Sequence, residues 1–207
     1  MLGYESSAGR GAWKTRWQVI GQVIVPGIGG SDATHWQTRW QQQWGADAVR
    51  IEPVSWSQPE LGDWVAAIER AVRAIEPRVD GIVLVAHSLG CWAVSEWLRH
   101  ARVEIPVGAF FVAPPDPAGE AFPARDAPTF VALREHRLPC ASMVVASADD
   151  PYCDRRKAEE LADGWGSGLL VAGSIGHINS ASGLGDWATG KDALDRLESR
   201  LAESAST

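Results

Sequence analysis

The chain of 207 residues carries a formal net charge of −7, and 45% of its residues are hydrophobic. This length fits a single domain with one sizeable core, and its 19 Lys and Arg form no dense run that could neutralise phosphates, which argues against nucleic acid and anionic membranes as partners. No apolar stretch approaches the roughly 18 to 20 residues that span a bilayer. The three cysteines have no metal-ligand spacing, so we expect no metal site, and their odd number fits a reducing compartment. We therefore expect a cytoplasmic protein.

Predicted strands and helices alternate along the chain. Residues 1–16, rich in Gly, Ser and Ala, are expected to form a leader outside the domain, which then spans residues 17–207. Apolar, β-branched runs predict strands over residues 18–25, 49–54, 82–87, 107–112, 141–146 and 169–172. Apolar residues at helical spacing predict a first helix that Asp32 caps, and further helices over residues 61–75, 89–100, 154–164 and 192–203. This alternation predicts an α/β fold in which helices cover both faces of a mostly parallel sheet.

The third predicted strand ends at a serine, and a helix begins at the next residue. The stretch is Ala86-His87-Ser88-Leu89-Gly90, which matches the G-x-S-x-G pattern of a nucleophile elbow except for the alanine at its first position. A serine in such a turn points its hydroxyl above the carboxyl edge of the sheet, where the N–H of Leu89 can donate to an oxyanion. Ser88 is therefore the predicted nucleophile.

A serine nucleophile needs a base, and His177 is the predicted one. It follows the last predicted strand, in a glycine-containing turn that can direct its ring toward Ser88. His87 directly precedes Ser88, and because adjacent side chains diverge at a tight turn we expect His87 to pack beside the sheet. We interpret the remaining histidines as surface or packing residues: His35, His100 and His136.

The acid that orients this base should follow the fifth predicted strand, where Asp149 and Asp150 are adjacent. Neighbouring side chains in an extended chain point to opposite faces, so only one of the two can point inward. Pro151 biases Asp150 toward extended geometry, but this bias does not choose between the two aspartates. Either choice gives the order Ser, Asp, His along the chain, which is that of α/β-hydrolase triads.

The loop after the first strand, residues 27–31, is expected to supply a second oxyanion donor. Its glycines let the backbone approach a substrate closely, and the donor is predicted to be the N–H of Ile28 or of Gly27. The same loop partly matches a dinucleotide-binding fingerprint, because it lies between a strand and a helix and Glu52 ends the second strand. That fingerprint needs its third glycine where Asp32 stands, and a carboxylate there would repel pyrophosphate. We therefore reject the dinucleotide interpretation.

These motifs together resemble a known family. The first loop begins P-G-x-G-G, the elbow is H-S-x-G, a D-D-P turn covers residues 149–151, and Gly176-His177 follows the last strand. In these features the chain, from residue 18 to its C-terminus, is similar to the small α/β-hydrolase family of retinoblastoma-binding protein nine and its bacterial relatives, which are serine hydrolases. The resemblance implies that Asp150 is the triad acid, because the second aspartate of the turn has that role in the family. Relatives often have glycine where this chain has Ala86.

The sequence thus predicts an α/β-hydrolase fold with a minimal cap, in which Ser88, His177 and Asp150 cleave a small ester, thioester or amide without a metal or organic cofactor. The expected oxyanion donors are the N–H groups of Leu89 and Ile28. The long proline-rich loop over residues 113–128 is the segment available as a cap, so the pocket should be shallow and open. Three aromatic residues are expected to line it: Trp56, Phe122 and Tyr152. The alternative is a protein-binding module on a hydrolase fold with little or no turnover.

Overall fold

A parallel β-sheet forms the centre of the molecule. The computed structural model describes residues 19–131 and 133–204, and the predicted leader of residues 1–16 lies outside them. Within the described residues, six strands form one sheet in the order β2-β1-β3-β4-β5-β6, and every neighbouring pair is parallel. The strands are β1 (Ile20–Val25), β2 (Ala48–Arg50), β3 (Gly81–His87), β4 (Val107–Val112), β5 (Ala141–Ala146) and β6 (Gly168–Val171). The predicted parallel α/β architecture is confirmed.

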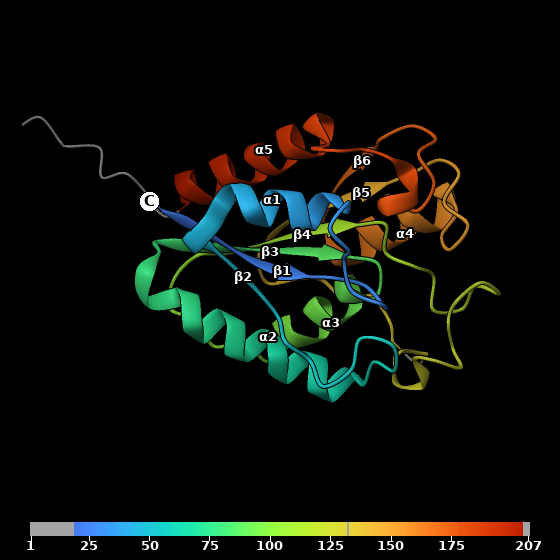
Figure 1. Ribbon diagram of the computed structural model, residues 1–207, viewed down its shortest axis with the longest axis horizontal. Helices are drawn as coiled ribbons and strands as arrows, with labels where there is room; N and C mark the ends of the chain where they lie inside the picture. Colours follow the sequence, from blue (N-terminus) through green and yellow to red (C-terminus); the bar gives the residue numbers. More distant parts are fainter. Residues whose placement is uncertain (1–18, 132, 205–207) are drawn as a thin grey trace, which may run out of the picture.

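Helices cover both faces of this sheet (Figure 1). One face carries α1 (Trp36–Trp44) and α5 (Ala188–Ser204), and the other carries α2 (Leu61–Ile75), α3 (Leu89–Leu98) and α4 (Arg155–Trp165). Each face has its own apolar core. The central strand β3 is buried along its whole length and serves both cores, because its successive side chains point to opposite faces: Leu84 packs with the α2 side and Val85 with the α1 side.

The second strand is shorter than its apolar sequence predicted. It was expected over residues 49–54, but the pairing with β1 stops at Arg50 and one further backbone bond, from the N–H of Ile51 to the carbonyl of Ile24, ends the ladder. Pro53 has no N–H to extend the ladder, and Val54 beyond it is 90% exposed. This edge of the sheet therefore ends before the chain turns into the loop that leads to α2.

The first helix begins later than predicted. Its N-cap is His35, whose ring Nδ1 accepts a hydrogen bond from the N–H of Gln37, and the expected cap Asp32 lies one turn earlier. The carboxylate of Asp32 accepts hydrogen bonds from the N–H groups of Thr34 and His35. An aspartate that bonds to the backbone two and three residues ahead stabilises a turn, so the helix begins only after that turn is complete.

All of the strands run in the same direction, so the loops that follow them meet at one edge of the sheet, on the right of Figure 1. The longest of these loops, residues 113–127, has no helix or strand, as predicted. It is tied to α3 by a hydrogen bond of 2.8 Å from the indole N–H of Trp92 to the carbonyl of Pro115. Across the described ranges, no helix has the length and apolar character needed to cross a membrane.

Candidate active site

Ser88 lies at the end of β3, in the sharp turn that leads into α3. Its backbone has φ 53° and ψ −127°, a conformation that costs a residue with a side chain about 1–3 kcal/mol. The turn is close to β1 and fits because two neighbouring residues are glycines. A Cβ at Gly90 would press on the carbonyl oxygens of Val25 and Pro26, and a Cβ at Gly27 would lie 2.7 Å from the Cβ of Ser88. The glycine at the end of the elbow motif therefore allows strand and helix to meet.

A methyl group at position 90 should disrupt this turn. We expect Gly90→Ala to lower the free energy of unfolding by about 1–3 kcal/mol, because the carbonyl oxygens of Val25 and Pro26 belong to a buried strand end and cannot easily move away. The matched control is Gly62→Ala in α2, where an added Cβ meets nothing within 4 Å and better helix propensity should be neutral or stabilising. Urea unfolding of both variants measures the difference, and equal stabilities would contradict this account of the elbow.

The ring of His177 lies between Ser88 and a carboxylate. Its Nε2 is 2.9 Å from the Oγ of Ser88, and its Nδ1 is 3.0 Å from each carboxylate oxygen of Asp150. An ionised carboxylate only accepts hydrogen bonds, so Nδ1 carries the ring hydrogen and Nε2 offers a lone pair to the serine hydroxyl. The ring of Tyr152 packs on that of His177, with 4.5 Å between centroids. This geometry can transfer a proton from Ser88 to His177.

The two adjacent aspartates after β5 make different contacts. Asp150 is 8% exposed and its carboxylate faces the His177 ring. Asp149 accepts hydrogen bonds from the hydroxyl of Ser147 at 2.7 Å and from the N–H of Gly176 at 2.8 Å. Both bonds lower the pKa of Asp149, and the bond from Ser147 has the larger effect. Asp150 is therefore the carboxylate that contacts the His177 ring, while Asp149 holds the backbone of Gly176, the residue before His177.

Two backbone segments approach Ser88 as possible oxyanion donors. Leu89 is the first residue of α3, so its N–H lies at the open end of that helix. In the loop after β1, the N–H of Gly29 donates to the carbonyl of Trp56 at 2.8 Å and is therefore engaged inside the protein. Ile28 precedes it and lines the same cavity as Ser88. The N–H groups of Leu89 and Ile28 stay the predicted oxyanion donors.

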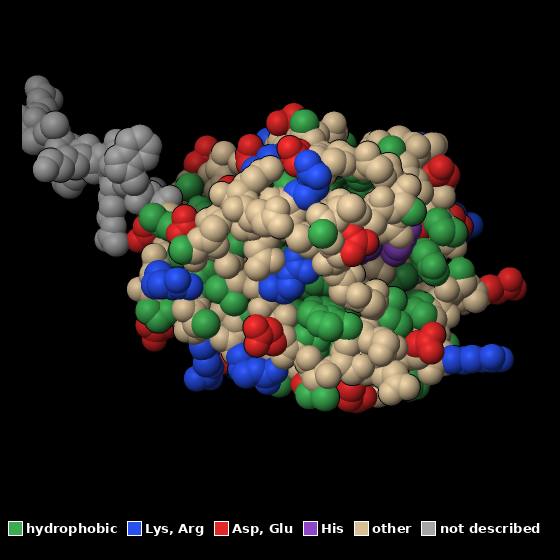
Figure 2. Space-filling model, viewed as in Figure 1, with side chains coloured by type: hydrophobic (Ala, Val, Ile, Leu, Met, Phe, Trp, Pro, Cys, Tyr) green, Lys and Arg blue, Asp and Glu red, His purple; other side chains and the backbone are tan. Residues whose placement is uncertain are grey.

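A cavity of about 420 Å³ opens over Ser88 at the carboxyl edge of the sheet. Figure 2 shows a histidine side chain in a recess near this edge, with hydrophobic side chains beside it. The loops after β1, β4, β5 and β6 each contribute to the walls. Apolar and polar residues both occur in the lining, among them Ile28, Asp32, Pro115, Pro123, Tyr152 and Asn179.

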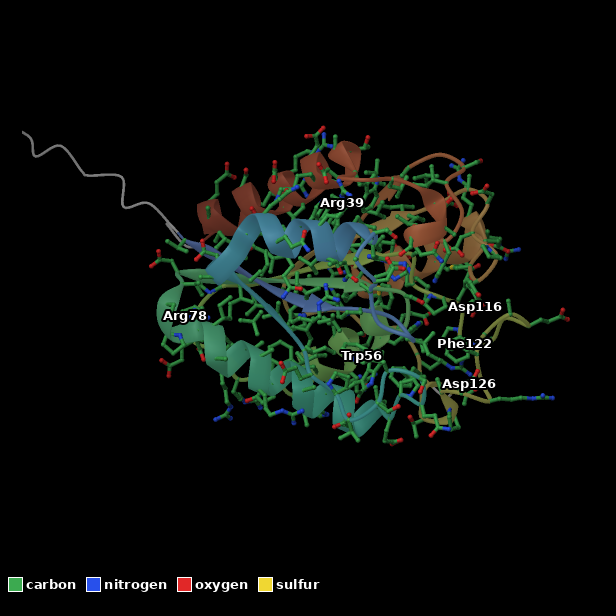
Figure 3. All side chains as sticks on the ribbon, in the orientation of Figure 1. Arg39, Trp56, Arg78, Asp116, Phe122 and Asp126 are labelled. Atoms are coloured by element: carbon green, nitrogen blue, oxygen red, sulfur yellow. The ribbon has the colours of Figure 1, made fainter. Side chains whose placement is uncertain are left out.

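Three aromatic residues were expected to line this cavity. In the described structure Tyr152 lines it, and the other two do not. Trp56 packs behind the glycine loop, where its ring would lie 3.6 Å from a Cβ on Gly30. Phe122, labelled in Figure 3, belongs to the long loop, is 7% exposed and packs into the core. Its neighbour Pro123 lines the cavity. The expectation for Trp56 and Phe122 is thus corrected: the first supports the glycine loop and the second anchors the long loop.

Two further histidines line the cavity over Ser88. His87 is 4% exposed, and its Nε2 lies 2.9 Å from the carbonyl oxygen of His177. The ring of His35 packs edge-on against the His87 ring, with 4.9 Å between centroids. Burial lowers the pKa of His35 to about 4 and holds the pKa of His87 well below its usual value. Neither ring therefore carries a charge next to His177 at neutral pH.

The buried His35 should make the protein less stable in acid. Its pKa is about 4 in the folded protein against about 6.5 in the unfolded chain, so the unfolded chain binds the proton first and the stability is lost as the pH falls from about 6.5 to about 4, by on the order of 3 kcal/mol. The variant His35→Asn keeps a good N-cap for α1 but has no ionisable ring. We expect its free energy of unfolding to fall less steeply than that of the wild type over this range. Identical pH profiles would contradict the prediction.

A parallel six-stranded sheet with a serine elbow at the end of its central strand defines the α/β-hydrolase class. Within that class, the chain belongs to the serine hydrolase family, whose sequence profile matches residues 22–196. The resemblance noted from the motifs is therefore confirmed at the level of the family.

Solved structures share this fold over most of their length. A protein of Pectobacterium atrosepticum that is named a YdeN-like hydrolase is 29% identical, with a TM-score of 0.75, covering 88% of this chain and 92% of that chain. The ydeN gene product of B. subtilis is 23% identical, with a TM-score of 0.65 and coverage of 86% and 99%. The type II thioesterase BorB of the borrelidin biosynthetic cluster is 13% identical, with a TM-score of 0.58 and coverage of 91% and 95%, and it shares the fold alone. No curated protein matches the chain.

Proposed function

We propose that this serine hydrolase cleaves a small ester, thioester or amide through an acyl-Ser88 intermediate. The observation that carries the proposal is the continuous chain of contacts from the Ser88 hydroxyl through both nitrogens of His177 to Asp150, at 2.9 and 3.0 Å. Such an arrangement activates a hydroxyl that is otherwise a weak nucleophile at neutral pH.

The proposed reaction has two halves. In the first, the Ser88 Oγ attacks the substrate carbonyl carbon while its proton moves to Nε2 of His177, and the N–H groups of Leu89 and Ile28 receive the oxyanion. The tetrahedral intermediate collapses when His177 gives that proton to the leaving group, which leaves an acyl-serine. In the second half, His177 takes a proton from water, the hydroxide adds to the acyl carbon, and the proton returns to Ser88 as the acid leaves. Asp150 stays ionised and stabilises the imidazolium.

The size of the cavity favours small substrates. Its volume of about 420 Å³ is bounded by short loops, and the long loop over residues 113–127 lies beside it without forming a separate cap domain. Apolar contacts from Ile28, Pro115 and Tyr152 suit a short acyl chain, while longer chains would extend into solvent. The same serine chemistry serves oxygen esters, thioesters and amides, so the proposed substrate class includes all three.

A series of p-nitrophenyl esters with increasing acyl length tests the proposal. We expect saturable hydrolysis of the short esters and a kcat/KM for the palmitate ester at least about ten-fold below that for the butyrate ester, because methylenes outside the cavity contribute no binding. A matched series of acyl thioesters separates the two leaving groups. If the folded protein hydrolyses none of these substrates, the alternative of a protein-binding module on a hydrolase fold is favoured instead.

A further inference from the structure

The backbone that carries the proposed base is held by two ring N–H groups from outside its own loop. The Nε2 of His87 lies 2.9 Å from the carbonyl oxygen of His177, and the indole N–H of Trp36 donates to the carbonyl of Ile178 at 2.8 Å. The donors come from different elements, since His87 ends β3 and Trp36 begins α1. Two consecutive carbonyl groups, one on the base and one just after it, are thus fixed from the same side of the sheet.

The loop needs such support because its own conformation is unfavourable. Ile178 has a φ of 50°, in the left-handed region that a β-branched residue rarely adopts, and Gly176 before the base has a φ of 63°. A conformation of this kind persists where surrounding contacts over-determine it. Ile178 is fully buried, so its carbonyl has no access to water as an alternative partner.

The chemistry of the contact defines which hydrogen His87 carries. A carbonyl oxygen only accepts, so the hydrogen is on Nε2 of His87, and in a neutral ring Nδ1 then has none. His87 cannot rotate freely, because the ring of His35 packs against it at 4.9 Å and the ring of Trp36 lies at 6.2 Å. The residue before the nucleophile is therefore a fixed donor to the backbone of the base.

We propose that His87 is a positioning residue of this hydrolase, and that it acts with Trp36 to orient the His177 ring toward Ser88 by holding the carbonyl groups of His177 and Ile178. The inference rests on the proposed function, because it assigns a role toward the proposed base. In the described structure His87 makes no hydrogen bond to the Ser88 hydroxyl. Its contact with the carbonyl of His177 gives the histidine at this position of the elbow a role.

The size of the effect follows from the other supports of His177. Its Nδ1 is held by Asp150, and the N–H of Gly176 is held by Asp149. Loss of the His87 bond leaves these contacts and the Trp36 bond in place, so the ring stays near Ser88 but samples misaligned positions. Small misplacements of a reacting group lower the rate by up to about 10²-fold. We expect a reduced kcat. In the described structure Trp36 lies outside the lining of the cavity, so its substitution should leave KM nearly unchanged, whereas His87 borders the cavity and its substitution can also change KM.

Four variants test the role. His87→Leu removes the donor, whereas His87→Gln places an amide nitrogen close to the position of the histidine Nε2. Trp36→Phe removes an indole N–H and keeps an aromatic ring. The matched control is Trp40→Phe, which removes an equivalent bond, from the indole N–H of Trp40 to the carbonyl of Asp186, in the same helix but away from the base.

The measurements are kcat and KM for a short-chain ester, with stability recorded for each variant. We expect His87→Leu and Trp36→Phe to lower kcat by about 10- to 100-fold, with a nearly constant KM for Trp36→Phe, whose side chain does not line the cavity. We expect the kcat of His87→Gln to recover to within about three-fold of the wild type, and Trp40→Phe to keep the wild-type kcat even if it loses stability. Should His87→Leu not fold, the Trp36 and Trp40 pair makes the comparison.

If the wild type is active, two results would overturn the positioning role without contradicting the proposed function. One is an unchanged kcat in folded His87→Leu and Trp36→Phe. The other is an equal loss of kcat in Trp36→Phe and Trp40→Phe. A wild type that is folded but turns over no ester or thioester would instead overturn the proposed function, and the positioning role with it. The two failures are therefore distinguished by the wild-type rate.

Discussion

Ser88→Ala is expected to lower kcat for a short-chain ester by at least about 10⁴-fold, because it removes the atom that forms the acyl intermediate. The fold should be retained, since the Cβ that fits beside Gly27 is kept and only the hydroxyl is lost. Steady-state hydrolysis with purified protein measures the loss, and circular dichroism checks the fold.

A control for this substitution is Ser57→Ala, at an exposed serine in the loop before α2. It removes the same atom away from the cavity and should keep the wild-type rate. Residual activity of Ser88→Ala within about ten-fold of the wild type would mean that another group performs the chemistry, since loss of a serine nucleophile from a working triad is far more damaging.

Asp150→Asn should reduce kcat by about 10³- to 10⁴-fold without unfolding the protein. The substitution keeps the size of the side chain but removes the negative charge that stabilises the imidazolium of His177. An amide can donate as well as accept, so it no longer fixes the ring hydrogen of His177 on Nδ1. The expected signature is a loss in kcat that addition of substrate does not overcome.

The neighbouring aspartate provides the matched comparison. Asp149→Asn retains an acceptor for the Ser147 hydroxyl and the Gly176 N–H, and Asp149 makes no hydrogen bond to the His177 ring in the described structure, so the loss in kcat should stay below about ten-fold. Identical chemical changes at adjacent positions thus give very different rates. The opposite ranking would move the acid to Asp149 and would contradict the contacts described above.

The fold could be predicted from the sequence because its central strands are continuous apolar runs. The expected bounds of β4 and β5 agree with the structure, since each run is preceded closely by a proline, Pro106 or Pro139, and ends in a loop. The edge strand β2 was predicted too long because an apolar sequence does not reveal where hydrogen bonding to β1 stops. The parallel direction of the strands follows from the alternation of strands and helices, because a helix between two strands returns the chain to the same end of the sheet.

The site was only partly accessible from the sequence. The elbow glycine pattern marked Ser88, and the position after a strand marked His177, but residue spacing did not choose between Asp149 and Asp150. That choice depends on how the loop after β5 turns, which the structure shows through its bonds to Ser147 and Gly176. The contact of His87 with the His177 carbonyl joins residues 90 positions apart and is a product of tertiary packing, for which local pattern gives no signal.

Labelling with a fluorophosphonate probe tests the central claim most directly, because such probes react with a serine hydroxyl only when a neighbouring base activates it. We predict that wild-type protein acquires one adduct, that peptide mass spectrometry locates it on Ser88, and that Ser88→Ala stays unlabelled. A folded wild-type protein that remains unmodified, or an adduct that forms equally in Ser88→Ala, would contradict the account.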